Sequence, residues 1–500
     1  MIAFPGARVA ADHLQPRLQE RALVRRTFRQ HQDMEYGPTV SAALAEYWNY
    51  TELEAHMHDL ARRCSDVVRL YSIGRSVEGR ELWALEVSDA PGRLEAEPNA
   101  KYVANMHGDE PSGRQLLVAL AEWLCVHHRR DARAGRIVAD MHLHLLPTMN
   151  PDGFEVNVRG NARGTDLNRD FPDPIERGAA GVQRPSGNEQ PETLAVMDWI
   201  RSGRFVASAS LHEGAVVANY PWDGSEDRGT HYAACPDDAA YVHLASMYAS
   251  AHASMAASAE FPGGITNGAA WYPLWGGMQD WNYLAGKCME LTLELSAAKG
   301  PPAALLPQLF ADNLAALLAF PLAAAFGGLR GLVMEAPTEP GGQRRLAAQA
   351  PKPRPLPARI DVLGINHTIV ASPEFGVFYR PLAPGTYNVT ASLDGHEAAT
   401  ATVSVPADGS GAQHAFSLVP LGAVTAAVVG GAASGWDLPR RFGAFGGPIV
   451  GKGSAPAGGL PAQLRWSAGL SPHHGATAAW EAAIGSARQI ASFARRAPAR

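Results

Sequence analysis

The sequence predicts an α/β fold, in which helices cover both faces of a mixed, mainly parallel sheet, followed by a small all-β sandwich. As far as about residue 325, apolar runs of strand length alternate with longer segments of helical period. Beyond residue 357, short strand patterns follow one another with no helical period between them. The 500 residues also exceed one ordinary domain, so more than one unit is expected.

The α/β part begins with a helix and two strands and then alternates between the two kinds of element. Leu53, Met57 and Leu60 recur at helical spacing, and the turn S-V-E-G-R separates the first two strands. The expected helices are 51–64, 112–128, 237–257 and an amphipathic one over 301–325. The expected strands are 67–73, 82–87, the run that ends at His107, 141–146, 205–211 and 287–295, with a polar, glycine-rich loop over 156–173.

The sandwich is predicted from strand-length patterns separated by turn residues. Its clearest strand alternates apolar Tyr387, Val389 and Ala391 with polar residues, as a half-buried strand does. The expected strands are 359–363, 368–370, 376–379, 386–393, 399–405 and 415–419.

Composition divides the chain into four segments. Residues 1–37 are rich in Arg and Gln and are expected to be poorly ordered, 38–327 form the α/β domain, and 328–420 form the sandwich. A Pro/Gln-rich stretch over 336–357 is predicted to be a surface loop. Residues 421–500 are Ala/Gly-rich with few large apolar side chains, so most of them are expected to be disordered.

The overall composition is that of a soluble globular protein. A net charge of −6 gives no support to nucleic-acid binding, and no nucleic-acid partner is expected. No transmembrane segment is predicted, because Leu314–Phe326, the most apolar candidate, is short and contains Pro321. The first residues lack the apolar core of a signal peptide. The four cysteines are widely spaced and either form two disulfides or stay free.

Several polar side chains lie where strands end. His107 and Glu110 are three residues apart at a strand-to-helix turn, and such a pair can bind one metal ion with a third ligand from elsewhere. His212 and Glu294 also lie at or near strand ends. Because ligands bind beyond the carboxyl ends of strands in open α/β sheets, these side chains can converge on one site.

Six blocks in constant order carry a resemblance to a known family. They are N-M-H-G-D-E-P-S-G-R, L-P-T-M-N-P-D-G-F-E, N-A-R-G-T-D-L-N-R-D-F-P-D, L-H-E-G-A-V-V-A-N-Y-P-W-D, I-T-N-G-A-A-W-Y-P-L-W-G-G-M-Q-D-W-N-Y and E-L-T-L-E-L-S. Over residues 40–327 the chain resembles the zinc metallocarboxypeptidases, in particular the regulatory branch that includes carboxypeptidases D, E, M and N. The sandwich is similar to the transthyretin-like domain of that branch.

The resemblance implies a catalytic centre with one Zn²⁺. His107, Glu110 and His212 would be the metal ligands, and Asp166 would orient a ligand imidazole, although a turn or cap aspartate is an equal alternative for Asp166. Glu294 would be the general base, where the alternative is an exposed strand glutamate. Arg159 would polarise the scissile carbonyl; Arg163 lies in the same loop, but Arg159 has the family's spacing to Asn168.

The resemblance also implies a substrate. Asn168, Arg169 and Tyr272 would hold the terminal carboxylate of a peptide. Asp223 and Gln279 match the positions at which the family's basic-residue enzymes carry an acid and a glutamine, although D-G is also a ready turn signal. The expected reaction is therefore removal of C-terminal Arg or Lys from peptides or proteins by a monomer. The resemblance places this monomer in the secretory pathway or outside the cell, and the lack of a visible entry signal leaves an intracellular location as the alternative.

Three acidic residues depart from the family pattern: Glu213 beside the second zinc histidine, Asp109 and Asp170. They could shift the pH profile or the choice of substrate. Glu213 keeps open a rival hypothesis, a binding protein of the same fold with impaired catalysis. A second rival, an enzyme for acidic C-termini, is disfavoured by Asp223 and Gln279.

Overall fold

The computed structural model describes residues 37–173, 178, 181–182, 184–337 and 353–422. The predictions for the N-terminal segment and for the Ala/Gly-rich tail fall almost wholly outside these residues. Most of the Pro/Gln-rich stretch does so as well. The proposed domain boundaries stay predictions.

The α/β part is built on one mixed, eight-stranded sheet with the order β1-β2-β4-β3-β5-β8-β6-β7. The four central strands β4, β3, β5 and β8 run parallel, whereas β1, β2 and β6 join antiparallel. The strands are β1 Val68–Arg75, β2 Glu81–Val87, β3 Asn99–Ala104, β4 His142–Leu146, β5 Phe205–His212, β6 Ala215–Tyr220, β7 Ile265–Asn267 and β8 Met289–Ser296. The predicted fold class is confirmed.

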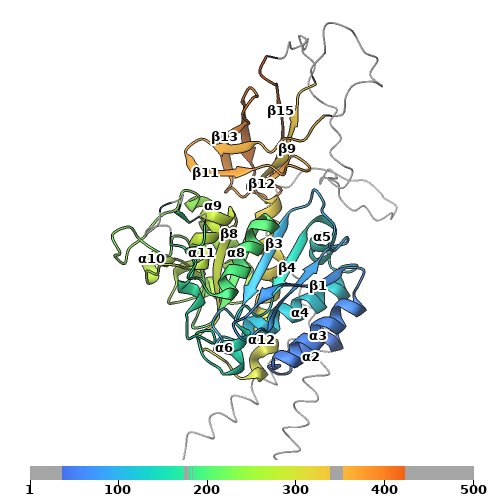
Figure 1. Ribbon diagram of the computed structural model, residues 1–500, viewed down its shortest axis with the longest axis vertical. Helices are drawn as coiled ribbons and strands as arrows, with labels where there is room; N and C mark the ends of the chain where they lie inside the picture. Colours follow the sequence, from blue (N-terminus) through green and yellow to red (C-terminus); the bar gives the residue numbers. More distant parts are fainter. Residues whose placement is uncertain (1–36, 174–177, 179–180, 183, 338–352, 423–500) are drawn as a thin grey trace, which may run out of the picture. The chain divides into compact units, whose positions relative to one another are not determined.

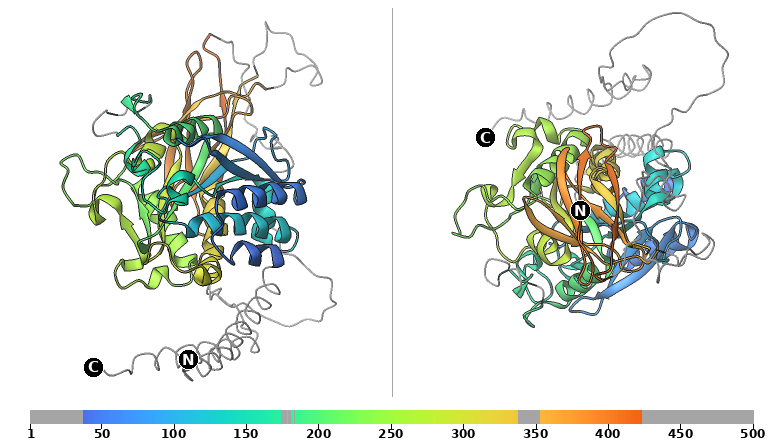
Figure 2. Two further views of the ribbon diagram at one scale, coloured as in Figure 1. Left: turned by 60° about the horizontal axis from the view of Figure 1, so that its bottom comes forward. Right: turned by 90° about the horizontal axis from the view of Figure 1, so that it is seen from above.

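Helices cover both faces of this sheet (Figures 1 and 2). Successive residues of β3 show the two faces, because Tyr102 and Ala104 belong to one apolar core and Val103 to another. The first core contains residues of α2, α3, α4, α5, α9 and α12, and the second contains residues of α8. The helices are α2 Pro38–Ala43, α3 Tyr50–Arg63, α4 Ser112–His127, α5 Ala132–Asp140, α6 Pro151–Glu155, α8 Pro191–Gly203, α9 Asp238–Ala251, α10 Gly268–Trp271, α11 Met278–Trp281 and α12 Leu306–Phe326.

The predicted elements recur with shifts of a few residues at their ends. The helix expected from Thr51 begins at Tyr50, because the Asn49 side chain caps it and Glu52 bonds back to the Asn49 backbone. Its predicted apolar residues Leu53, Met57 and Leu60 are buried. The elements that were not predicted are helices α2, α5, α6, α8, α10 and α11 and strands β6, β7 and β9.

Helix α12 differs from the amphipathic helix that was predicted. It continues through Pro321, and its apolar residues surround it rather than forming one stripe. Within the described residues, Ala303–Phe326 is long and apolar enough to cross a membrane by length and composition alone. It packs against α4, α5 and α9, as the core helix of a folded domain does.

One disulfide links two of the helices. Cys64, at the end of α3, is bonded to Cys125 in α4 across a sequence separation of 61. Cys235 and Cys288 are buried free thiols. The sequence analysis expected either two disulfides or free cysteines, and the structure differs from both, with one disulfide and two free thiols among the described residues.

The C-terminal part is a sandwich of two sheets, with strand orders β11-β10-β13-β14 and β12-β9-β15. Its apolar core draws on both sheets and includes Leu329, Ile360, Val389 and Phe416. The strands are β9 Leu329–Glu335, β10 Arg359–Val362, β11 Ile365–Val370, β12 Val377–Arg380, β13 Gly385–Ser392, β14 Ala399–Val405 and β15 Ala412–Leu418.

Contacts join the sandwich to the α/β part. The buried Arg380 guanidinium lies 2.7 Å from the buried Asp237 carboxylate. The Tyr379 hydroxyl donates a hydrogen bond of 2.8 Å to the carbonyl of Ala96, and His367 stacks on Tyr283.

Candidate active site

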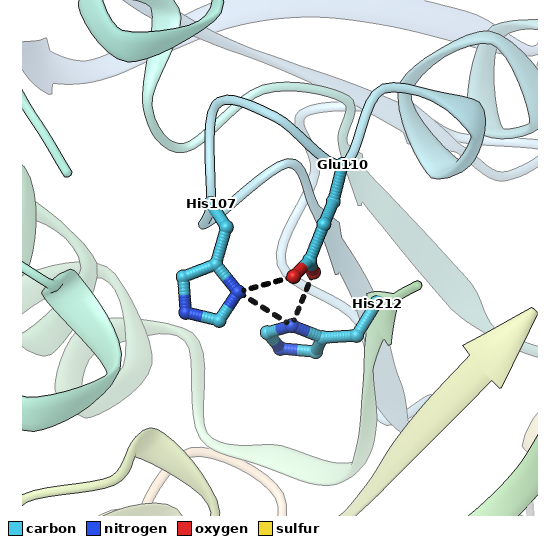
Figure 3. Close-up of side chains that lie close together, drawn as sticks. All are labelled: His107, Glu110 and His212. Carbon is cyan, nitrogen blue, oxygen red and sulfur yellow. Dashed lines mark hydrogen bonds and ion pairs between the residues drawn. The ribbon is translucent and has the colours of Figure 1, made fainter. Parts of the chain in front are cut away.

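Three side chains meet where β3 and β5 end. His107 Nδ1 lies 2.9 Å from Glu110 Oε1, and His212 Nδ1 lies 2.9 Å from Glu110 Oε2. The two Nδ1 atoms are 3.2 Å apart, and all three side chains are buried. Figure 3 shows both imidazoles and the carboxylate pointing toward one another. The sequence-predicted ligand set is therefore brought together.

The turn that carries His107 and Glu110 is held by the side chain of Asn105 and by close packing at Gly108. Asn105 adopts a positive φ of 54°, and its side-chain amide donates to the carbonyls of His107 and Glu110. Gly108 is required by close approach, because a Cβ there would lie 2.2 Å from the backbone carbon of Gly153. The turn thus packs directly against the short helix α6, which contains Gly153.

The donor atoms fit a zinc ion. Neighbouring ligands of a tetrahedral zinc, each at about 2.0–2.1 Å from the metal, lie about 3.3–3.4 Å apart. The observed separations of 2.9–3.2 Å are close to this spacing. Burial alone would raise the pKa of Glu110, but the contacts with His107 and His212 lower it far below its usual value. An ionised carboxylate and two imidazoles are donor types that zinc takes at catalytic sites.

The far nitrogen of each imidazole has its own partner. His107 Nε2 lies 3.1 Å from Asp166 Oδ1, so Asp166 contacts a ligand imidazole, and it also caps the short turn at Asn168. His212 Nε2 lies 3.0 Å from Ser210 Oγ. Sequence reasoning missed Ser210, although a residue two before His212 on a strand shares its face.

Glu294 lies beside His212 because β5 and β8 pair in parallel with these two residues in register. Its side chain is buried, and Oε2 has no hydrogen-bond partner in the described ranges of the chain. Burial raises the pKa of Glu294 to about 7, and the neighbouring Glu110 and Glu213 act in the same direction. A carboxyl with such a pKa can exchange a proton near neutral pH. The alternative of an exposed strand glutamate is excluded.

Arg159 reaches the same cluster. Its Nε donates to Asp166 Oδ2 at 2.9 Å, and its guanidinium lies 3.1 Å from His107 Nδ1 and 3.5 Å from Glu110 Oε1. Arg163 is not among the residues that line the cavity at this cluster.

A cavity of about 220 Å³ opens beside the cluster. Its lining includes most of the site residues predicted from the sequence: His107, Glu110, Arg159, Asn168, His212, Asp223, Tyr272 and Glu294. Arg169 lines a neighbouring hollow and donates to the carbonyl of Asn168 at 2.8 Å, whereas Gln279 lies behind Asp223. These side chains come from distant strands and loops, and the tertiary structure gathers them around one space.

The zinc carboxypeptidase family profile matches residues 53–316. The chain belongs to the zinc carboxypeptidase family. Carboxypeptidase SOL1 of Arabidopsis thaliana is 44% identical over 398 residues, which cover 79% of this chain and 76% of that protein. The carboxypeptidase N catalytic chain of Mus musculus is 42% identical over 402 residues, covering 73% and 84%. Carboxypeptidase D of Homo sapiens is 39% identical over 390 residues, covering 74% of this chain and 27% of that protein.

Asp223 closes the inner end of the carboxypeptidase's cavity. Its Oδ1 accepts hydrogen bonds from Asn219 Nδ2 at 3.0 Å and from Gln279 Nε2 at 2.9 Å. Burial raises the pKa of Asp223 to about 6. Gly268 leaves room for this carboxylate, since a Cβ there would lie 2.1 Å from Oδ1. Sequence reasoning missed Asn219, which lies only four residues before Asp223.

The first departure from the family pattern, Glu213, is turned toward the backbone. Its carboxylate accepts hydrogen bonds from the N–H of Ser112, at the start of α4, and from the N–H of Gly300 at 2.6 Å. Burial raises the pKa of Glu213 to about 7. The side chain thus holds two segments together at the rim of the site.

The other two departures also have local partners. Asp170 Oδ2 accepts from the N–H of Gln190 at 2.7 Å, where α8 begins. Asp109 lies 3.8 Å from the ammonium of Lys299, which itself lies 2.6 Å from Glu110 Oε1. Sequence reasoning missed Lys299, for which no spacing rule pointed to the cluster.

Proposed function

We propose that this carboxypeptidase removes C-terminal Arg or Lys from peptides or proteins. The observation that carries the proposal is the set of buried acceptors at the inner end of the cavity. Asp223 is 1% exposed, and Oδ1 of Asn219, which also lines the cavity, is buried with no hydrogen-bond partner among the described residues. Arg and Lys side chains offer only donors, and a buried unpaired acceptor costs about 1–3 kcal/mol. A basic side chain would satisfy these atoms, whereas an acidic one would add a further anion.

Each residue around the cluster has a separate role in the proposed peptide hydrolysis. Bound to His107, Glu110 and His212, a zinc ion supplies Lewis acidity and lowers the pKa of water. Glu294 accepts the proton of the attacking water and passes it to the leaving amine, for which a pKa near neutrality is suited. The Arg159 guanidinium stabilises the negative charge that develops on the carbonyl oxygen.

Exopeptidase action also requires recognition of a free C-terminus. Asn168 and Tyr272 line the cavity, and Arg169 is near enough to influence the pKa of both Tyr272 and Asp223. A guanidinium with neighbouring amide and phenol groups suits a carboxylate, which takes paired hydrogen bonds. We therefore assign these three residues to the terminal carboxylate of the substrate.

The disulfide supports an oxidising compartment. Bridges such as Cys64–Cys125 persist in the secretory pathway and outside the cell, and are rare in reducing compartments. We propose that the enzyme acts there, as a monomer, on peptides that end in Arg or Lys.

The test is release of the terminal residue from matched peptides that end in Arg, Lys, Phe or Glu, with and without removal of zinc by a chelator. Zinc-dependent release from the Arg and Lys peptides alone supports the proposal. Preferred release from the Glu peptide would overturn the assigned specificity. Zinc binding with no release from any peptide would favour the binding protein of the same fold, against which the orientation of Glu213 already argues.

A further inference from the structure

A second cluster of side chains that could hold a metal ion lies at the opposite end of the central strands from the active site. One ligand atom from each of Glu95, Glu97 and His142 lies within 4.8 Å of the others. His142 is the first residue of β4, and its neighbour β3 runs parallel to it and leads to His107 at the far end. The cluster is therefore separate from the catalytic cavity.

The imidazole of His142 is buried and aimed at the two acids. It is 3% exposed, and its Nε2 has no hydrogen-bond partner within the part of the chain that the structure describes. Nε2 lies 3.8 Å from Glu95 Oε2, which is too long for a hydrogen bond. Neighbouring ligands of a tetrahedral zinc lie about 3.3–3.4 Å apart, so an approach of about 0.5 Å would bring the two atoms to the spacing of two ligands of one ion. Oε2 of Glu97 is buried at the same place.

The orientation of His142 is fixed from behind. Its Nδ1 lies 2.8 Å from Glu86 Oε1, while Glu86 is itself held by the N–H of Gly92 and the guanidinium of Arg69. A carboxylate behind an imidazole holds the ring with its other nitrogen toward a metal, as in carboxylate–histidine–zinc arrangements.

The segment that carries the two acids is anchored on both sides. The N–H of His142 donates to the carbonyl of Pro98 at 3.0 Å, next to Glu97. The carbonyl of Ala96, between the two acids, accepts the hydrogen bond from Tyr379 of the sandwich. An ion at this cluster would therefore stiffen the segment on which the sandwich rests.

We propose that Glu95, Glu97 and His142 bind a divalent transition-metal ion, for which Zn²⁺ is the probe, at the junction of the two parts of the chain. An imidazole and two carboxylates match zinc, whereas the imidazole disfavours calcium and magnesium. A proton competes with the metal ion for the imidazole of His142. Burial alone lowers the pKa of His142, but the contact with Glu86 and the nearby Glu97 and Glu95 outweigh it and raise that pKa.

The experiment compares the zinc content of the full-length protein with that of the double variant Glu95→Gln/Glu97→Gln, which keeps shape but removes both charges. Each protein is equilibrated with excess zinc, desalted and analysed by mass spectrometry for metal per chain. The control is Glu46→Gln/Glu260→Gln, which makes the same charge change at two exposed acids. The expected result is one equivalent of zinc less in the double variant than in the wild type and the control.

The expected difference of one equivalent of zinc does not depend on how many ions the catalytic site holds. The outcome of this experiment is therefore independent of whether the proposed peptidase activity is correct. The wild type should also gain a few degrees more in melting temperature on adding zinc than the double variant. Equal zinc content in all three proteins would overturn the proposal. Should the double variant not fold, anomalous diffraction at the zinc edge from wild-type crystals decides, since no peak beside His142 would overturn it as well.

Discussion

The replacement Asp223→Asn tests the assigned specificity most directly. The substitution keeps the shape of the side chain, and its carbonyl oxygen can still accept from Asn219 and Gln279 in place of Oδ1. It removes the negative charge and points an amide toward the space where the cation of the substrate would lie. Removing one partner of a buried ion pair costs about 3–5 kcal/mol. At about 1.4 kcal/mol per factor of ten, kcat/KM for a peptide ending in Arg should fall by about 10²- to several 10³-fold.

The assay measures kcat/KM for two peptides that differ only in a terminal Arg or Phe. The loss should be confined to the Arg peptide, because Phe makes no ion pair. Asp227→Asn, on the exposed part of the same loop, is the matched control and should leave both values unchanged. A ratio of Arg to Phe activity that changes less than about threefold on Asp223→Asn, which is under 1 kcal/mol, would refute the reasoning.

The same carboxyl predicts a pH dependence of specificity. Because burial raises the pKa of Asp223 to about 6, the group is neutral below that pH and charged above it. The preference of the wild type for Arg over Phe should therefore increase as pH rises through about 6. Asp223→Asn should show no such rise, since it has no proton to lose there.

Three further predictions follow from single features. Glu294→Gln should lower kcat by about 10²- to 10⁴-fold with little change in KM or zinc content, and steady-state kinetics with a retained kcat would speak against its role as the base. Cys125→Ser opens the loop closed with Cys64 and should lower the free energy of unfolding in urea by about 4 kcal/mol; an unchanged midpoint would contradict this. Burial, with help from nearby cations, lowers the pKa of His367 to about 2, whereas the value in the unfolded chain is about 6.5. Below about pH 6.5 the unfolded state therefore binds a proton that the folded state does not. The free energy of unfolding then falls by up to about 1.4 kcal/mol for each pH unit of acidification. His367→Phe should flatten that slope between about pH 6.5 and 4, and parallel stability curves for the two proteins would show that His367 does not cause it.

The sequence by itself determined the fold class and the principal elements. Apolar periodicity reports which faces of an element are buried, and that information is local, so α3, α4, β5 and β8 were predicted close to their observed positions. Helix α8 was missed although Pro191 at its first position and Glu192 in its first turn are helix-start signals, and strand β9 was missed although two glycines precede it. Periodicity also could not give the strand order, which depends on contacts between distant segments.

For the candidate site, the sequence likewise supplied the residues and the tertiary structure supplied their arrangement. The ordered motifs named His107, Glu110, His212 and Glu294 as candidates. Only the parallel register of β5 and β8 decided that Glu294 lies beside His212, and only strand adjacency brought His212 to His107.

Only the tertiary structure decided which side chains contact one another. Ser210 and Lys299 reach the site from positions outside the quoted motifs, and Asn219, which lies inside one of them, was not predicted to contact Asp223. Cys64 pairs with Cys125 because α3 and α4 hold their ends together, whereas spacing left the pairing open. Glu213, next to His212 in the sequence, turns to the backbone of Ser112 instead. The physical reason is that a sequence pattern fixes the face on which a side chain lies, while its partner depends on which distant segment packs against that face.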